Sequence, residues 1–120
     1  MTAARILVVE DNALLARSFD DILTRAGADV VGPAGTLDEA EQLANTEQLS
    51  GAMLDIKLNS HEVWPVARIL GARGVPYIFC SGHFDYTSLP AEWSKHPILV
   101  KPARPRNIID TLVKVLGGTI

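Results

Sequence analysis

The sequence lacks several features that mark particular classes of protein. Its 120 residues include one cysteine, Cys80, which excludes an internal disulfide and suits a reducing compartment. No run of lysine or arginine stands out and the formal net charge is −3, so direct DNA or RNA binding has no electrostatic support. No stretch approaches the roughly 18 apolar residues of a membrane span, and the N-terminus has no signal-peptide core. We therefore expect a soluble, cytoplasmic chain without a membrane segment.

What is present describes an ordinary globular protein. Hydrophobic residues make up 48% of the chain and charged residues 21%, a composition that is not typical of a disordered chain. The length suits one compact domain over residues 1–120 and leaves little room for a second. A domain of this size can bury a sizeable core without disulfide support.

Short apolar runs alternate along the chain with segments of helical spacing. Continuous apolar character, rather than strict alternation, is typical of strands that are covered on both faces. Gly32-Pro33 is expected to stop the second run, and a capping box formed by Thr36 and Glu39 predicts the start of the second helix. The expected strands are 6–9, 30–31, 51–54, 76–80 and 98–100. The expected helices follow Asn12, follow Thr36, span 63–70, follow Pro90 as a short element, and begin at Pro105.

This strict alternation predicts the α/β class, with a five-stranded parallel sheet and helices on both of its faces. In such a doubly wound sheet, functional groups gather beyond the carboxyl ends of the strands. The first expected strand ends in Glu10 and Asp11, the third in Asp55, the fourth in Ser81 and the fifth in Lys101. These side chains are therefore expected at one edge of the sheet.

Each of these residues alone has an ordinary structural interpretation as a turn, cap or surface residue. Together, however, they bring three carboxylates, a hydroxyl and an amine to one place. Crowded carboxylates repel one another, and a hard divalent cation such as Mg²⁺ relieves the repulsion with all-oxygen ligands. A carboxylate can act as a nucleophile and form an aspartyl phosphate, which makes Asp55 the candidate phosphoacceptor. Lys101 and Ser81 would then stabilise the phosphoryl oxygens.

At this point the pattern resembles the receiver domain of two-component response regulators over nearly the whole chain. The matching segments are Ile6-Leu7-Val8-Val9-Glu10-Asp11, Leu54-Asp55, Ser81-Gly82 and Val100-Lys101-Pro102. The resemblance implies a flavodoxin-like (βα)5 fold with strand order 2-1-3-4-5. It also implies roles for individual residues: Glu10 and Asp11 as metal-site acids, Asp55 as phosphoacceptor and metal ligand, the carbonyl of Lys57 as a further ligand, Ser81 as the switch hydroxyl, Lys101 as the phosphoryl-binding lysine, and a cis peptide bond before Pro102.

Three positions depart from the receiver pattern. Ile98 stands where many receivers carry the aromatic switch residue, three residues before the lysine, which makes conventional coupling to Ser81 doubtful. Leu58-Asn59 replaces the usual Met/Leu-Pro, and Ala103 replaces the usual aromatic residue. The stretch 74–85 is similar to a receiver subgroup with a Phe-x-Thr-Gly-Tyr-type sequence, whose members are often single-domain and occur with unorthodox histidine kinases in alphaproteobacteria.

The resemblance implies a single-domain response regulator that takes its phosphoryl group from a histidine kinase or a histidine phosphotransfer protein, with Mg²⁺ or Mn²⁺. It implies a phosphoacceptor rather than an enzyme, a monomer or weak dimer, and a downstream protein target that the sequence does not name. One alternative is a phosphate sink for a shared kinase. Another is a small phosphatase with an aspartyl nucleophile, although Lys57 occupies the position of its second acid.

Two further alternatives remain on the same architecture. A nucleotide- or flavin-binding module lacks its glycine-rich phosphate loop here. A pseudo-receiver would lack one of the acids or the lysine, and none is missing. His61, His83 and His96 do not have metal-ligand spacing. Trp64 and Trp93 are expected to pack internally or to face a partner.

Overall fold

The computed structural model describes residues 3–82, 89–118 and 120 of the chain. Its strands are β1 (Arg5–Val9), β2 (Asp29–Ala34), β3 (Gly51–Asp55), β4 (Lys57–Leu58), β5 (His61–Glu62), β6 (Tyr77–Ser81) and β7 (Ile98–Val100). Its helices are α1 (Ala13–Arg25), α2 (Leu37–Thr46), α3 (Trp64–Ala72), the one-turn 3-10 helix η2 (Ala91–Trp93) and α4 (Pro105–Leu116).

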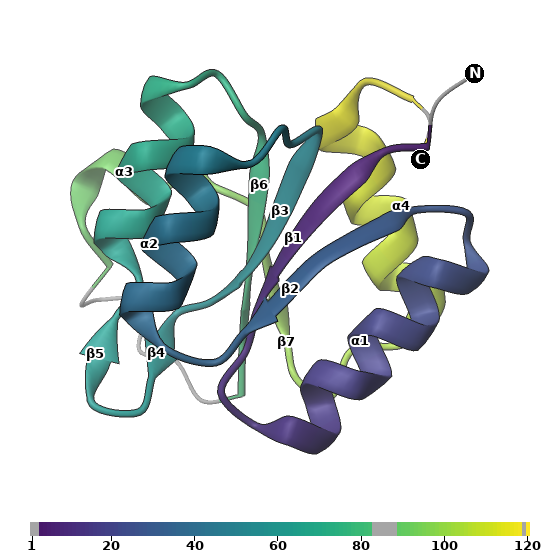
Figure 1. Cartoon of the computed structure of the whole chain (residues 1–120), viewed down its shortest axis with the longest axis horizontal. Helices are drawn as coiled ribbons and strands as arrows, with labels where there is room; N and C mark the ends of the chain where they lie inside the picture. The colour runs from purple at the N-terminus through teal and green to yellow at the C-terminus, as the bar shows by residue number, and fades with distance from the viewer. Residues whose placement is uncertain (1–2, 83–88, 119) are drawn as a thin grey trace.

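Five of the strands form one parallel sheet in the order β2-β1-β3-β6-β7. This order is the predicted 2-1-3-4-5 pattern, because β4 and β5 lie outside the main sheet. Helices α2 and α3 cover one face, and α1 and α4 cover the other (Figure 1). The doubly wound α/β fold predicted from the alternation of strands and helices is therefore confirmed.

Alternate residues of the strands enter two separate cores, as the two-residue period of a strand requires. On β3, Leu54 joins the layer under α2 and α3, whereas Met53 joins the layer under α1 and α4. On β6, Phe79 and Ile78 divide in the same way. Burial on both faces explains why these strands appear as continuous apolar runs in the sequence.

Strand β2 is longer than the sequence predicted. The expected stop at Gly32-Pro33 is wrong, because the strand continues to Ala34 with an irregularity in its register against β1. Two properties allow this continuation. The strand lies at the edge of the sheet, where a proline without an N–H is tolerated. Gly32 has a φ of +92°, a conformation that glycine adopts without steric cost.

A small antiparallel hairpin, formed by β4 and β5, follows β3 and was not predicted. Lys57 pairs with Glu62 and Leu58 pairs with His61. Asn59 has a φ of 57° in the intervening turn, a left-handed conformation that asparagine tolerates better than most residues. The hairpin therefore begins two residues after Asp55 and belongs to the segment that borders the expected site.

The short helix expected after Pro90 is the single turn η2 in the part of the chain that the structure describes. Trp93 N–H donates to the Pro90 carbonyl at 2.9 Å, which is the i to i+3 bond of a 3-10 helix. Pro97 lies one residue before β7 and disfavours helical conformation at the residue that precedes it. A longer helix therefore has little room in the described segment between Pro90 and β7.

The helix ends follow their sequence signals closely. The side chain of Asn12 accepts hydrogen bonds from two backbone N–H groups of the first turn of α1. Thr36 caps α2 by accepting from the backbone N–H of Glu39, but the Glu39 side chain accepts from Gly35 rather than from Thr36. The predicted capping box is thus formed on one side only. None of the helices in the described ranges is long and apolar enough to cross a membrane.

Candidate functional site

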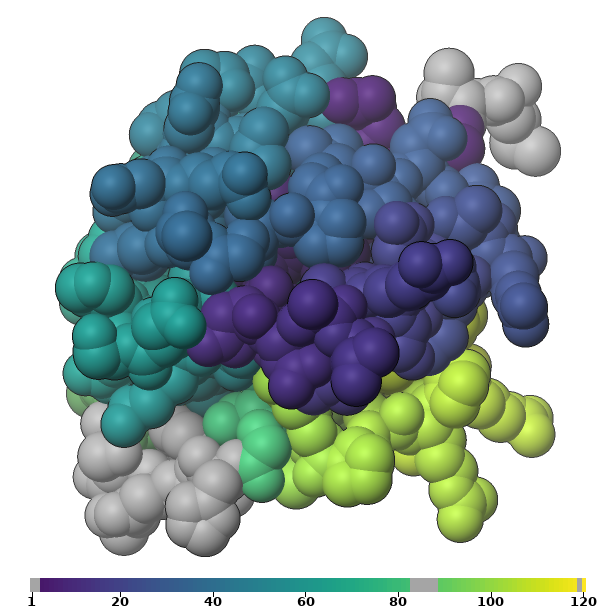
Figure 2. Space-filling view, turned by 60° about the horizontal axis from the view of Figure 1, so that its bottom comes forward, coloured from purple at the N-terminus to yellow at the C-terminus, as the bar shows by residue number. Residues whose placement is uncertain are grey.

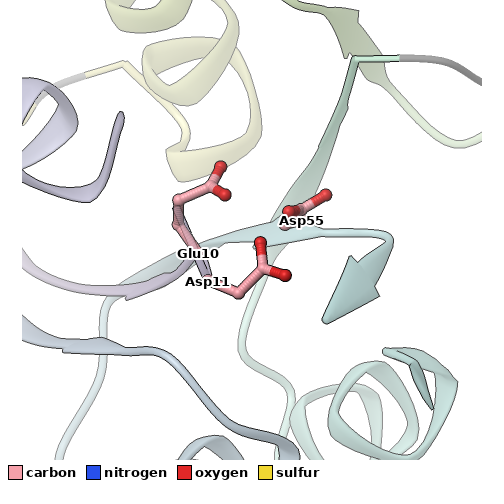
Figure 3. A group of neighbouring side chains, drawn as sticks. All are labelled: Glu10, Asp11 and Asp55. Carbon is pink, nitrogen blue, oxygen red and sulfur yellow. The ribbon is translucent and has the colours of Figure 1, made fainter. Parts of the chain in front are cut away.

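Three carboxylates converge at the edge of the sheet where the parallel strands end. Glu10 and Asp11 follow β1, and Asp55 is the last residue of β3. Each contributes an oxygen to a group whose atoms all lie within 4.8 Å of one another. Figure 3 shows the three side chains extending from these two neighbouring segments toward a common space. Glu10 and Asp55 are buried, whereas Asp11 is exposed and forms the outer side of the group.

Lys101 supplies a positive charge to the same place from the end of β7. Its Nζ lies 2.5 Å from Oε1 of Glu10 and 3.2 Å from Oδ2 of Asp55. The backbone N–H of Lys101 donates to the carbonyl of Ser81 at 2.9 Å, which fixes the start of the loop after β7 against the end of β6. The three strand ends β1, β3 and β7 therefore meet through one ammonium group.

The buried position of Asp55 changes its acidity. Burial raises the pKa of Asp55 to about 7; the neighbouring Glu10 carboxylate adds to the rise, and Lys101 opposes it. For Lys101, burial on its own would lower the pKa, but the two carboxylates outweigh that effect and the pKa is raised. The ammonium group of Lys101 is thus held charged beside a carboxyl group whose pKa is raised.

Asp11 is positioned by the hairpin that follows β3. Its Oδ2 accepts a hydrogen bond of 2.7 Å from the backbone N–H of Asn59. Partial burial alone would raise the pKa of Asp11, but this bond and those from the other two acids outweigh it, so the pKa is lowered. The carboxylate therefore stays ionised and faces the group from the solvent side.

Glu10 is held by its own local contacts. Its Oε2 accepts from the backbone N–H of Asn12 at 3.1 Å, and its backbone N–H donates to the carbonyl of Ala34 at 2.9 Å. Since Asn12 also caps α1, one short segment orients both the acid and the helix that follows it. The Glu10 side chain thereby points inward to Lys101, whereas Asp11 points to the hairpin.

The structure also describes most of the other residues singled out in the sequence. Ser81 is buried at the end of β6, and the peptide bond between Lys101 and Pro102 is cis. Lys57 is exposed in β4, two residues beyond Asp55. Ile98 is half-buried at the start of β7 and pairs in register with Phe79 of β6. His83, and the subgroup resemblance over 83–85, lie outside the described residues.

Sequence reasoning missed one contributor, Asn59. It acts through its backbone N–H, whose direction depends on the hairpin turn and not on the identity of the side chain. The pair Asn59-Ser60, two turn-forming residues after a strand, is the signal that could have indicated a turn at this position.

The donor set fits a hard divalent cation. Three carboxylates offer only oxygen ligands, the type that Mg²⁺ and Mn²⁺ prefer. Burial raises the pKa of Asp55, and the neighbouring Glu10 carboxylate raises it further; a cation between the carboxylates would offset this repulsion. Asp11 is exposed on the outer side of the group, which leaves a route from solvent to its oxygen atoms.

Comparison with curated proteins found one significant match. The chain is 27% identical over 117 residues to the phyllosphere-induced regulator PhyR of Methylorubrum extorquens, an alignment that covers 95% of the chain. It covers 44% of PhyR, so the chain spans less than half the length of this curated relative. No protein-family model matches the chain.

Solved structures match this chain over nearly their full length. SdrG from Sphingomonas melonis is 30% identical with a TM-score of 0.79, over 98% of this chain and 97% of that one. A response regulator receiver protein from Sinorhizobium medicae is 26% identical with a TM-score of 0.80, over 96% and 95%. The receiver domain of a sensor histidine kinase from Pseudomonas aeruginosa, solved with a magnesium ion coordinated in its active-site cleft, is 19% identical with a TM-score of 0.78, over 98% and 100%.

Proposed function

The chain belongs to the receiver domains of response regulators, and from that premise we propose that it is a phosphorylation switch in a phosphorelay, with Asp55 as the phosphoacceptor. The single observation that carries the proposal is the meeting of Asp55 with two further acids and the ammonium group of Lys101 at one sheet edge. A nucleophilic carboxylate needs such surroundings, because phosphoryl transfer depends on positioning and charge neutralisation.

The transfer requires little of the protein beyond these groups. A carboxylate oxygen of Asp55 forms a bond to phosphorus while the bond from phosphorus to a histidine nitrogen of the donor breaks, and that nitrogen keeps the electron pair. Lys101 is close enough to Asp55 to pair with an oxygen of the incoming phosphoryl group. Ser81, at the end of the adjacent strand, is proposed to donate to another oxygen, which would couple the modification to the end of β6.

Mg²⁺ or Mn²⁺ is proposed as the cofactor, held by Asp11, Asp55 and the carbonyl of Lys57, with Glu10 beside them. When bound, the cation supplies positive charge that offsets the carboxylates and the phosphoryl oxygens. The all-oxygen donor set supports this assignment, as does the magnesium ion in the active-site cleft of the receiver domain from Pseudomonas aeruginosa. Glu10 is proposed to act mainly on Lys101, because its Oε1 lies against that ammonium group.

The proposed phosphodonor is a histidine kinase or a histidine phosphotransfer protein. A donor histidine must reach Asp55, so its protein has to cover the surface around this edge. A groove of about 770 Å³ runs between α1 and the start of α4, the two segments that follow the site acids and Lys101. These segments lie together on the face that Figure 2 turns toward the viewer. Leu14 is 82% exposed on this groove, where an apolar partner surface would cover it.

The proposal is tested by incubating the chain with acetyl phosphate and Mg²⁺ and measuring the intact mass. We expect a phosphoryl adduct in the wild type that is absent in Asp55→Ala and absent when the metal is chelated. Asp29→Asn, which changes an exposed acid at the start of β2, should label like the wild type. An unmodified wild-type mass, under conditions that label another receiver domain, would count against the proposal.

A further inference from the structure

The described residues contain a connected aromatic cluster whose members come from three elements, α3, β6 and η2. The indoles of Trp64 and Trp93 are stacked, with ring centroids 4.8 Å apart and an angle of 18° between their planes. Phe79 meets both of them edge-on, at 5.5 Å from Trp64 and 6.0 Å from Trp93. The stack joins α3 to η2, two elements of the same side of the sheet (Figure 1).

Trp64 is tied to the segment that follows Asp55. Its Nε1–H donates to Oε2 of Glu62 at 2.9 Å, and Glu62 pairs with Lys57 in the hairpin. The neighbouring Val63 N–H donates to the carbonyl of Ile56 at 2.8 Å. A change in the loop after Asp55 therefore has a direct route to the position of the Trp64 ring.

Trp93 is tied to the strand that ends in Ser81. Its Nε1–H donates to the hydroxyl of Tyr77 at 2.6 Å. Tyr77 and Phe79 belong to the same core layer, and Ser81 follows them at the two-residue period of β6, so all three lie on one face of the strand. His96 stacks on Tyr77 at 4.4 Å and lies 2.6 Å through Nε2 from its carbonyl oxygen, so this nitrogen donates. Residues 89–97 are thus fastened to β6 at two points.

Position 98 cannot supply the coupling that an aromatic switch residue gives in other receivers. Ile98 is a half-buried aliphatic residue that packs against the same core layer and pairs with Phe79. The indole stack, in contrast, contacts the hairpin after Asp55 through Glu62 and contacts strand β6 through Tyr77 and Phe79. The hairpin begins two residues after Asp55, and β6 ends in Ser81.

We propose that the Trp64–Trp93 stack transmits the state of the Asp55 site to η2 and the segment 89–97, in place of an aromatic residue at position 98. This inference rests on the proposed function, because the signal it transmits is phosphorylation of Asp55. Phosphorylation moves the hairpin and the end of β6 together; the stack holds η2 to both and thereby orders it.

The test is amide hydrogen exchange of the full chain, with and without acetyl phosphate and Mg²⁺, in the wild type and in Trp64→Leu. In the wild type, exchange in segment 89–97 should slow by at least about fivefold on phosphorylation, the lower end of typical coupling between sites. In Trp64→Leu the mass adduct should still form, but exchange should slow by less than about twofold. Trp64→Phe keeps an aromatic ring but loses the hydrogen bond to Glu62, so its ratio of exchange rates without and with phosphorylation should lie between those of the wild type and Trp64→Leu. This variant keeps the test valid if Trp64→Leu does not fold.

Arg68→Gln is the matched control. The Arg68 guanidinium lies 5.2 Å from the centroid of the Trp93 ring and pairs with Glu92 at 2.8 Å, so its loss loosens η2 without touching the Trp64 link. Exchange in segment 89–97 should still slow on phosphorylation in Arg68→Gln. A response of wild-type size in both Trp64 variants, or its loss in Arg68→Gln as well, would overturn the inference. Absence of the mass adduct in the wild type would instead refute the proposed function.

Discussion

The backbone N–H of Asn59 and Oδ2 of Asp11 form a 2.7 Å hydrogen bond that joins the hairpin turn to the end of β1. This bond holds the one exposed carboxylate of the acidic group beside the two buried ones. It also means that the position of the hairpin and the position of Asp11 depend on each other. Metal binding by Asp11 should therefore change the position of the hairpin as well as that of the site residues.

Neutralising Asp11 should weaken metal binding. Asp11→Asn removes one negative oxygen ligand, so we expect the affinity for Mg²⁺ to fall by about tenfold or more, since ligand charge tunes affinity for hard cations. Titration calorimetry with Mg²⁺ measures the change. Asp29→Asn removes the same charge from an exposed position outside the acidic group, and should bind Mg²⁺ like the wild type. Equal affinity in the two variants would remove Asp11 from the metal site.

Removing the ammonium group should destabilise the metal-free protein. Lys101→Met leaves the carboxylates of Glu10 and Asp55 facing each other without a cation, and we expect a loss of about 1–3 kcal/mol in the free energy of unfolding. This is less than for a fully buried pair, because the Lys101 side chain keeps 12% exposure. Urea unfolding in chelator gives the value, and added Mg²⁺ should recover part of it. Lys57→Met, at an exposed position, serves as control; a loss of the same size there would show that the effect is not due to the buried acids.

Stability should depend on pH through His96. Burial lowers the pKa of His96, so between its folded and unfolded values the unfolded chain binds more protons. The contribution of His96 to the free energy of unfolding is therefore fully present above the ordinary histidine pKa of about 6.5. It is lost as the pH falls through the lower pKa that His96 has in the folded protein. His96→Asn should show a shallower fall in unfolding midpoint between about pH 7 and pH 5. His61→Asn, at an exposed position, should retain the wild-type slope; identical slopes in all three proteins would contradict the prediction.

A methyl group at position 32 should destabilise the fold, whereas one at position 35 should not. A Cβ on Gly32 would lie 2.7 Å from the backbone nitrogen of Ala34, and the φ of +92° is strained for other residues. We expect Gly32→Ala to lower the free energy of unfolding by about 1–3 kcal/mol. At Gly35 the nearest atom lies at 3.8 Å, an ordinary contact. Urea unfolding of Gly32→Ala and Gly35→Ala compares them directly, and equal stabilities would rule out strain at position 32.

Much of the fold was predictable because its signals are local or obey simple periodicity. The apolar runs in β1 and β3 are buried on both faces, and Asn12 caps α1 as the sequence indicated. The continuation of β2 through Gly32 was not predictable from local rules, since it depends on the strand lying at the sheet edge. The same is true of the hairpin, whose two-residue strands are too short for a periodic signal.

Some features of the candidate site were likewise predictable from the sequence, and others were not. Meeting of Asp11, Asp55 and Lys101 at one edge follows from the rule that parallel strands end together, and needs only the order of the strands. Contacts made by the backbone, such as that from Asn59 to Asp11, do not depend on the type of side chain, so the sequence does not indicate them. The stack of Trp64 on Trp93 is equally hidden, because it joins residues from different elements whose packing the sequence pattern does not specify.

The acids of the site come from two separate strands, Glu10 and Asp11 after β1 and Asp55 at the end of β3, so all three are neighbours only while the sheet is assembled. An unfolded chain has no comparable cluster to offer a cation. Magnesium should consequently act as a ligand for folding itself: at a free concentration of a hundred times its dissociation constant, it would add about 2.7 kcal/mol to the free energy of unfolding. The free concentration of divalent ions would then help set both the fraction of the protein that can accept a phosphoryl group and its free energy of unfolding.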